Sequence, residues 1–181
     1  MPSPIAHSVS GYAIARISSG DRGPVPRSKL QPWLYGIGVA NAADLDFIPQ
    51  FLTGTKYHHG FSHSLLFCLG VSVCVYIAAS LRNKTVARAG FWLTLALYGS
   101  HLLLDFFTDG GDGIQLFWPF AMGYFRSPTP LFPSTHWSEP LLQHPGHWLF
   151  LGVEVVYSLF LVGIVQFWSA RRRKEKWQNR F

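Results

Sequence analysis

Charged side chains are scarce in this chain of 181 residues, in which Asp, Glu, Lys and Arg together make up 13%. Soluble domains usually contain about 25% charged residues. Hydrophobic residues make up 49% of the chain and aromatic residues 16%. The composition therefore argues against a soluble globule and favours a protein whose outer surface contacts lipid. The length predicts one domain.

Cysteine is also rare, and the two present lie in one apolar run. A helix would point Cys68 and Cys74 well away from each other, so we expect small packing residues rather than a disulfide or a metal pair. A cleavable signal sequence is not predicted, because residues 1–20 lack a basic start followed by a continuous apolar core. We expect the N-terminus to stay in the mature protein.

The net charge of +6 has an uneven distribution. Five of the fifteen basic residues fall within residues 171–176, directly after a long apolar segment. This pattern is commoner at the cytoplasmic end of a membrane helix than on a nucleic-acid-binding face. We therefore expect no nucleic-acid partner, and we divide the chain into a membrane-embedded domain at 1–170 and a basic cytoplasmic tail at 171–181.

Three segments are apolar and long enough to cross a bilayer whose hydrocarbon core is roughly 30 Å thick, namely 64–81, 89–107 and 148–168. Two weaker segments, 4–17 and 31–43, each begin near a proline and predict short helices. The sequence thus predicts an all-α, multi-pass membrane bundle of about five helices.

The polar residues separate by chemistry along the chain. If the helices alternate in direction, the basic clusters fall on one side of the membrane, and nearly all acids and histidines fall on the other. The positive-inside tendency makes the basic side cytoplasmic, so the histidines face outward. The long connection 108–147 contains six prolines, and we expect it to form a cap whose Phe117 and Trp118 lie at the membrane interface.

The segment "SHLLLD" gives the sharpest local signal. His101 and Asp105 are four residues apart in a helical run, so both side chains project from one face about one turn apart. An acid near the end of an apolar span is costly to bury without a cation or a partner. The pair predicts either two metal ligands or a hydrogen-bonded pair at a helix end.

Three further segments place histidines or acids on the same predicted side. "ANAADLDFIP" contains Asp44 and Asp46, whose carboxylates share a direction only if the segment is extended. "YHHGFSHSLL" places His58 and His63 on either side of Gly60, which lets the backbone fold so that they converge. "SPIAHSVSG" adds His7, four residues before Gly11, whose small size allows close helix packing.

Each of these signals has a structural alternative when taken alone, but four segments on one side favour a metal site over coincidence. A mixed set of imidazoles and carboxylates suits Zn²⁺, Mn²⁺ or Fe better than Ca²⁺ or Mg²⁺. The predicted ligands are His7, Asp46, His58, His63, His101 and Asp105.

Other polar residues give weaker signals. Asp109 lies one turn beyond Asp105, where it is either an acceptor behind the ligands or part of an Asp-Gly loop that includes Asp112. A last group lies in and after the predicted cap, and it either binds a second ion or a substrate head group or lies at the surface: His136, His144, His147 and Glu154.

Five ordered motifs, "PSPIAHSVSG", "DLDF", "HHGFSHSLL", "SHLLLD" and "LFWPF", span residues 2–120. Together they resemble the bacterial inner-membrane-associated metal-dependent hydrolases, the YdjM-like family, also described as LexA-binding. The family usually reads His-Arg-Gly-x-Ser/Thr-His-Ser, so His58 and His63 align with its histidines, and His59 stands where arginine is usual. The resemblance implies that His59 contacts substrate, and we expect Trp118 to do so as well.

The order of the ligands is more distantly similar to that of zinc-dependent phospholipase C enzymes, which are all-α phosphoesterases. That similarity implies that His7, His58 or His63, His101 and Asp105 are ligands, and that Asp46 is a ligand or a general base. Fold similarity does not by itself imply activity.

The sequence leads to a hypothesis of metal-dependent hydrolysis at the membrane, most readily of a phosphoester in a lipid or lipid-linked substrate. A divalent ion, most readily Zn, activates water there, and Asp44 or Asp46 orients or deprotonates that water. Two alternatives stay open: a non-catalytic metal carrier or sensor, and a structural polar seal between short helices. The basic tail also allows a cytoplasmic protein partner or attraction to anionic lipid.

Overall fold

A computed structural model describes residues 2–19, 32–55, 57–109, 111–133 and 145–178. These residues form six α-helices, two short 3-10 helices, two isolated β-bridges and no strand. The elements in chain order are α1 (Pro4–Ser18), α2 (Pro32–Ala40), η1 (Ala43–Asp46), α3 (Phe47–Thr53), η2 (Phe61–His63), α4 (Leu65–Ser80), α5 (Lys84–Phe106) and α6 (Pro145–Gln178). The predicted all-α class is confirmed.

Three of the expected helices begin at side chains that cap them. Ser3 accepts a hydrogen bond from the Ile5 amide at the start of α1, and Ser64 accepts one from Phe67 at the start of α4. Asn83 accepts from two amides at the start of α5. Such caps satisfy amides that have no partner within the helix. The helix α3 was not predicted, and it makes six helices where about five were expected.

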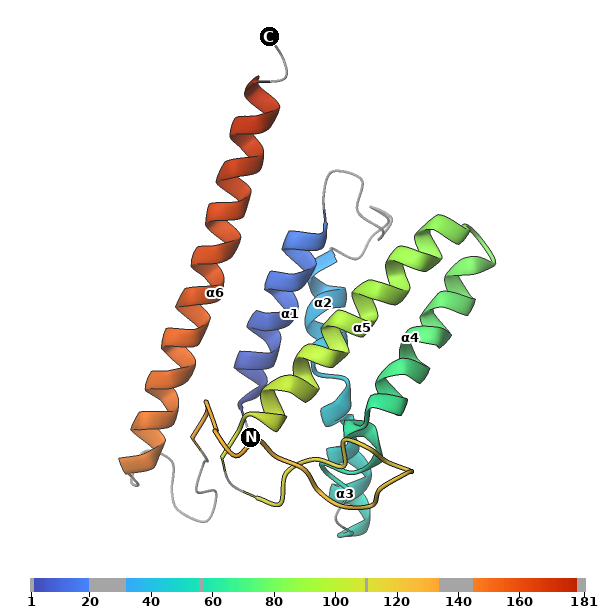
Figure 1. The fold of residues 1–181 in the computed structure, drawn as a ribbon, viewed down its shortest axis with the longest axis vertical. Coiled ribbons are helices and arrows are strands. Elements are labelled where there is room, and N and C mark those ends of the chain that lie inside the picture. Colours follow the sequence, from blue (N-terminus) through green and yellow to red (C-terminus); the bar gives the residue numbers. More distant parts are fainter. Residues whose placement is uncertain (1, 20–31, 56, 110, 134–144, 179–181) are drawn as a thin grey trace.

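Helices α1, α2, α4 and α5 form the body of the molecule, and α6 lies alongside α1 (Figure 1). The backbones of α1 and α2 come into contact at Gly11 and Gly36. A Cβ built on either glycine would lie 2.4 Å from the carbonyl oxygen of the other. The predicted role of Gly11 in close helix packing is confirmed.

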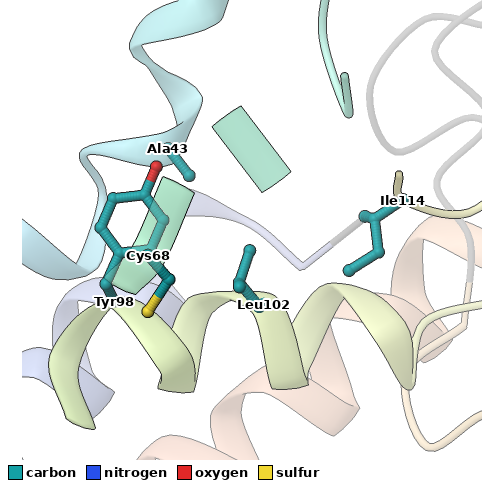
Figure 2. Packing of buried hydrophobic residues seen from close by; sticks show 5 residues of the cluster. All are labelled: Ala43, Cys68, Tyr98, Leu102 and Ile114. Carbon is teal, nitrogen blue, oxygen red and sulfur yellow. The ribbon is translucent and has the colours of Figure 1, made fainter. Parts of the chain in front are cut away.

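Five residues of the buried apolar core are shown in Figure 2. The core joins η1, α4, α5 and the loop after α5 through Ala43, Cys68, Tyr98, Leu102 and Ile114. The Tyr98 hydroxyl donates a hydrogen bond to the Ser62 carbonyl at 2.8 Å, which fixes η2 against α5. Cys68 has the packing role predicted for it, whereas Cys74 is exposed.

Membrane crossing is the point at which the structure departs most from the sequence-based expectation of three strong spans. Among the described helices, only Gly146–Glu175 is both long and apolar enough to cross a bilayer. Helix α4 has 16 residues, or about 24 Å, because Ser64 starts it and the helix ends at Ser80. Helix α5 has 23 residues but bears Lys84 and Arg88 at one end and His101 and Asp105 near the other.

Polar contacts fasten α6 to α1 at three levels. The Glu154 carboxylate accepts hydrogen bonds from the Ser3 amide and hydroxyl, the latter at 2.6 Å. Ser10 and Tyr157 share a hydrogen bond of 2.7 Å, and Arg172 donates to the Ile17 carbonyl at 2.9 Å. From the sequence, Glu154 was a candidate ligand for a second ion or a substrate head group. In the structure its carboxylate instead accepts hydrogen bonds from Ser3 at the start of α1.

The two ends of the bundle differ in charge. The basic ends are those of α1 and α6 together with the α4–α5 turn, and all three lie at one end of the molecule (Figure 1). They carry Arg16, Arg82, Lys84, Arg88, Arg171, Arg172, Arg173 and Lys174. The 3-10 helices and the last turn of α5, which carry the acids and histidines, lie at the opposite end.

The described half of the proline-rich connection runs along this second end. Its chain pairs Thr108 with Phe132 and Ile114 with Phe125, and the Gln115 amide donates to the His59 carbonyl at 3.0 Å. This part of the connection therefore contacts the histidine loop, as expected for a cap. Residues 134–144, and with them His136 and His144, lie outside the described residues.

Candidate metal centre

Four side chains from three elements converge at the end of the bundle away from the basic residues. They are Asp44 of η1, His63 of η2, and His101 and Asp105 of α5, and one ligand atom from each lies within 4.8 Å of every other. We call this set the metal centre. His63 and His101 have no exposed surface, and Asp105 is 4% exposed.

The separations within the metal centre suit ligands around one ion. Two atoms bound to Zn²⁺ at about 2.0 to 2.1 Å in a tetrahedral arrangement stand about 3.3 Å apart. The Nε2 atom of His63 lies 3.1 Å from Nε2 of His101, 3.3 Å from Asp105 and 3.6 Å from Asp44. His101 Nε2 lies 3.0 Å from Asp105 and 3.5 Å from Asp44. Several of these separations exceed the range of a hydrogen bond.

Buried atoms at the centre lack hydrogen-bond partners. Within the described residues, such atoms include Asp44 Oδ1, both Asp105 carboxylate oxygens and both ring nitrogens of His7. Leaving a buried carboxylate without a partner costs several kcal/mol. A cation among these atoms would satisfy them together.

His7 reaches the same place from α1. Its ring stacks on His101 with 3.9 Å between centroids, and its Nε2 lies 3.5 Å from Asp105 Oδ1. The residue has no exposed surface. His7 and His63 therefore approach different oxygens of the Asp105 carboxylate.

Hydrogen bonds at Nδ1 hold several of the histidine rings in place. His101 Nδ1 donates to the Ala40 carbonyl at 2.8 Å, and His58 Nδ1 donates to Asp46 at 2.8 Å. His59 Nδ1 donates to the Gly113 carbonyl at 3.1 Å. Partners of this kind fix the tautomer and the ring direction of metal-binding histidines.

Asp46 differs from the ligand and catalytic roles predicted for it. Its two oxygens accept hydrogen bonds from His58 and Ser62, and Oδ2 also lies 3.1 Å from His63 Nδ1. Burial opposes ionisation, but these contacts outweigh it and lower the pKa of Asp46. The residue lies behind two histidines instead of beside the ion position, because a 3-10 helix turns Asp44 and Asp46 in different directions.

His63 lies among three carboxylates, those of Asp44, Asp46 and Asp105, whose negative charges change its pKa. Burial alone lowers the pKa of this imidazole, but interactions with Asp105, Asp44 and Asp46 outweigh burial and raise it to about 11. Burial also opposes ionisation of Asp44, yet His63 and His101 lower its pKa. A proton on His63 thus supplies the positive charge that the surrounding carboxylates need.

The loop that carries His58, His59 and His63 folds as the glycine predicted. His59 has a left-handed backbone with φ of 65°, and Gly60 donates its amide to the Tyr57 carbonyl at 3.0 Å. A Cβ on Gly60 would lie 2.6 Å from that carbonyl oxygen, so the turn needs glycine.

Gln50 of α3 holds the start of this loop and was missed from the sequence. Its side-chain oxygen accepts hydrogen bonds from the amides of Tyr57 and His58, at 3.0 and 2.9 Å. No motif marked Gln50, because its partners depend on where α3 packs.

Other predicted residues lie away from the centre. Trp118 packs on Phe61, with 5.9 Å between ring centroids, and lines an apolar groove along α4. Asp109 pairs with Arg126 at 3.6 Å. His147 is buried near the start of α6, and no grouping of potential ligands among the described residues includes it.

Comparison with known proteins agrees with the ordered motifs. The family model described as YdjM inner membrane protein matches residues 1–174. The chain belongs to this family. The match extends well beyond residues 2–120, on which the sequence-based resemblance rested.

A curated relative points to the same membrane. Inner membrane protein YbcI of Escherichia coli (strain K12) is 36% identical over 99 residues, which cover 51% of this chain. The match covers 56% of the length of that relative. No solved structure matches the chain. The family and the relative thus support a protein of the bacterial inner membrane.

Proposed function

We propose that this membrane protein is a metal-dependent hydrolase whose ion is held by Asp44, His63, His101 and Asp105, with His7 beside them. The observation that carries the proposal is the set of ligand separations of 3.0 to 3.6 Å around buried atoms without hydrogen-bond partners. Two imidazoles with two carboxylates suit Zn²⁺, with Mn²⁺ or Fe as alternatives, and suit Ca²⁺ or Mg²⁺ poorly.

The reaction we infer is cleavage of a phosphoester in a lipid or lipid-linked substrate. When bound, a divalent ion supplies Lewis acidity for a phosphoryl oxygen and a hydroxide nucleophile near neutral pH. Asp44 is the ligand best placed to orient the attacking water, because its side chain is 14% exposed, whereas that of Asp105 is fully buried. Asp46 orients His58 and His63, and so acts through other residues.

Substrate access is consistent with a lipid. An apolar groove of about 800 Å³ lies between α5 and α6, and its lining includes Leu103 and Leu104, directly before Asp105 in the chain. Such a groove can take an acyl chain while the head group reaches the exposed edge of Asp44. His59 lies next to the centre, close to His63, whereas Trp118 is placed to contact the lipid tail or the membrane interface.

For the arrangement in the membrane, we propose that α4 and α5 cross together with α6, which gives a multi-pass topology. The basic end of the bundle then lies in the cytoplasm with the C-terminus, and the metal centre faces outward. The gathering of most described basic residues at the end of the bundle away from the metal centre supports this orientation.

Metal analysis tests the first part of the proposal. Purified wild-type protein in detergent is expected to contain stoichiometric metal, and the double variant His101→Ala, Asp105→Ala is expected to lose it and to have no activity on a phosphoester panel. His147→Ala, which removes a buried histidine outside the centre, is the matched control and keeps its metal. Full occupancy in the double variant would refute the assignment.

A non-catalytic metal carrier or sensor is the second candidate. The near-complete burial of His63, His101 and Asp105 favours it, because closed sites are typical of structural ions. It predicts the same metal content and the same loss in the double variant, but no turnover of any phosphoester by the wild type.

A further inference from the structure

A small groove opens between α4 and α5, towards the turn that joins them at the basic end of the bundle (Figure 1). Its volume is about 240 Å³, and its lining consists of Val73 and Tyr76 from α4 and Arg88, Phe91 and Trp92 from α5. Arg88 is the only charged residue in this lining, and the other side chains are apolar or aromatic. The groove therefore combines a cation with an apolar surface, as a lipid with an anionic head group requires.

Arg88 has no counterion in the described part of the chain. Its side chain is exposed, and it makes no hydrogen bond or ion pair with the described residues. Glu175, a described acid at the same end of the molecule, is paired with Arg171 at 3.4 Å. The Arg88 guanidinium therefore keeps its donors for a ligand, and its planar fork suits two oxygens of a phosphate.

Two more cations lie close to Arg88 in the chain. Lys84 is four residues earlier on α5, so the two side chains project from one face of the helix, about 6 Å apart along its axis. Arg82 lies in the α4–α5 turn, and both residues are exposed. Like charges on neighbouring turns repel each other. An anion at Arg88 relieves this repulsion, whereas another cation would increase it.

The aromatic side chains of the groove are typical of the level of lipid head groups. Trp92 lies one turn beyond Arg88 and is 66% exposed, and its ring contacts Phe91 with 5.1 Å between centroids. Tyr76 lines the groove from the facing helix. Trp and Tyr are enriched where a bilayer meets water. In the membrane arrangement proposed above, the groove faces the cytoplasmic leaflet.

We propose that this groove binds one anionic phospholipid of the cytoplasmic leaflet. The Arg88 guanidinium donates hydrogen bonds to the phosphate, and one acyl chain lies against Val73 and Trp92. The groove is smaller than pockets that enclose a whole ligand, which span about 300 to 1,000 Å³, so most of the lipid stays in the bilayer. The inference rests on the crossing of α4 and α5 in the proposed function, and it depends neither on the metal centre nor on hydrolysis.

Charge selects the head group. Phosphatidylcholine has the same phosphate as phosphatidylglycerol, but it adds a fixed ammonium cation, which Arg82 and Lys84 repel. Phosphatidylglycerol adds a neutral glycerol and keeps its net negative charge. The apolar lining contacts the acyl chains of both lipids alike. We therefore expect a preference for phosphatidylglycerol, and this preference should decrease as salt is added.

The test titrates the full-length protein in a non-ionic detergent with dioleoyl phosphatidylglycerol or dioleoyl phosphatidylcholine, and native mass spectrometry counts the bound lipid. Wild type is expected to bind one phosphatidylglycerol per chain in preference to phosphatidylcholine. Arg88→Gln is expected to bind phosphatidylglycerol about tenfold more weakly, because it loses hydrogen bonds between charged groups. Arg173→Gln is the matched control. It removes the same charge from an exposed position on α6 outside the groove, and it should bind like wild type.

Trp92→Ala tests the apolar part of the groove. It is expected to weaken the binding of both lipids while the preference for phosphatidylglycerol remains. Unchanged binding of both lipids by this variant would overturn the placement of the acyl chain.

Other outcomes would overturn the lipid site as a whole. Equal weakening in Arg88→Gln and Arg173→Gln would show a general attraction to the basic end, and equal binding of the two lipids by wild type would show no selection by charge. Metal content measured on the same samples separates this inference from the proposed function. Wild type with metal but without the lipid preference would refute the lipid site alone, and wild type with the preference but without metal would refute the metal centre alone.

Discussion

At the scale of single residues, three contacts fix the orientation of the His101 ring at the metal centre. Its Nδ1 donates to the Ala40 carbonyl, its Nε2 lies 3.0 Å from Asp105, and the ring of His7 stacks on its face. Each contact comes from a different stretch of chain. The ring therefore has one tautomer and one direction before any ion arrives, which lowers the entropic cost of binding.

The pKa of His63 predicts proton release on metal binding. Because the folded-state pKa is raised to about 11 from an ordinary value of 6.5, the imidazolium stabilises the metal-free fold fully below about 6.5, and this contribution is lost as pH rises through about 11. Zn²⁺ must displace that proton, so metal affinity should rise about tenfold per pH unit between pH 7 and 8.

Calorimetric titration with Zn²⁺ in two buffers of different ionisation enthalpy measures this release. About one proton per chain should leave at pH 7.5 from His63. An observed heat that does not depend on the buffer would show that His63 is already neutral in the metal-free protein.

At the level of elements, the crossing of α1 and α2 positions the support of His101. Gly11 and Gly36 let the two backbones touch, and α2 ends at Ala40, whose carbonyl holds the His101 ring. Helix α5 supplies two ligands from successive turns, while η1 and η2 supply one each. The centre is thus assembled from separate helix ends, and its geometry depends on how closely those helices pack.

Gly36→Ala is expected to weaken both the fold and the metal site. The added Cβ would lie 2.4 Å from the Gly11 carbonyl oxygen and 2.7 Å from the Ala15 Cβ, so the helices must separate. We expect a loss of about 1 to 3 kcal/mol in unfolding free energy, and weaker Zn²⁺ binding because Ala40 moves.

The matched control is Gly38→Ala in the same helix, where a Cβ meets nothing within 4 Å. It should be neutral or should stabilise the helix by up to about 1 kcal/mol. Thermal unfolding in detergent and Zn²⁺ titration compare the two variants. Equal stability of the two would show that the glycine contact does not limit the packing of α1 on α2.

At the scale of the whole molecule, charge and lipid-facing surface are distributed along one axis. Helix α6 exposes large apolar side chains such as Val156, Leu159 and Phe160. Most of the described basic residues lie at one end of the bundle, Arg126 excepted, and the metal centre lies at the other. This distribution suits a protein oriented across an inner membrane.

Thiol labelling tests the proposed orientation. In a background with Cys74→Ser, Thr53→Cys places a thiol on exposed α3 and Lys174→Cys places one near the end of α6. A membrane-impermeant reagent should label position 53 in intact spheroplasts, and position 174 only after the membrane is opened. Labelling of position 174 alone in intact spheroplasts would reverse the orientation, and equal labelling of both would exclude a spanning arrangement.

Much of the fold could be predicted from the sequence because helix starts are local. The expected segments 4–17 and 31–43 correspond closely to α1 and α2, and Ser64 begins α4 as a cap. Helix α3 was missed because its seven residues include Pro49 and have no apolar periodicity. Membrane crossing was harder to predict, since the apolar stretch at 64–81 is longer than the helix within it.

The sequence by itself determined which residue types could form a metal site and on which segments they lie. His7, His63, His101 and Asp105 follow from spacing, side and motif order. Only the tertiary structure decided between Asp44 and Asp46, because a 3-10 helix directs one carboxylate to the centre and the other to the back of His58 and His63. The tertiary structure also fixed the position of the His59 ring, which donates a hydrogen bond to the Gly113 carbonyl in the loop after α5. Such directions depend on contacts between distant segments, which local sequence does not encode.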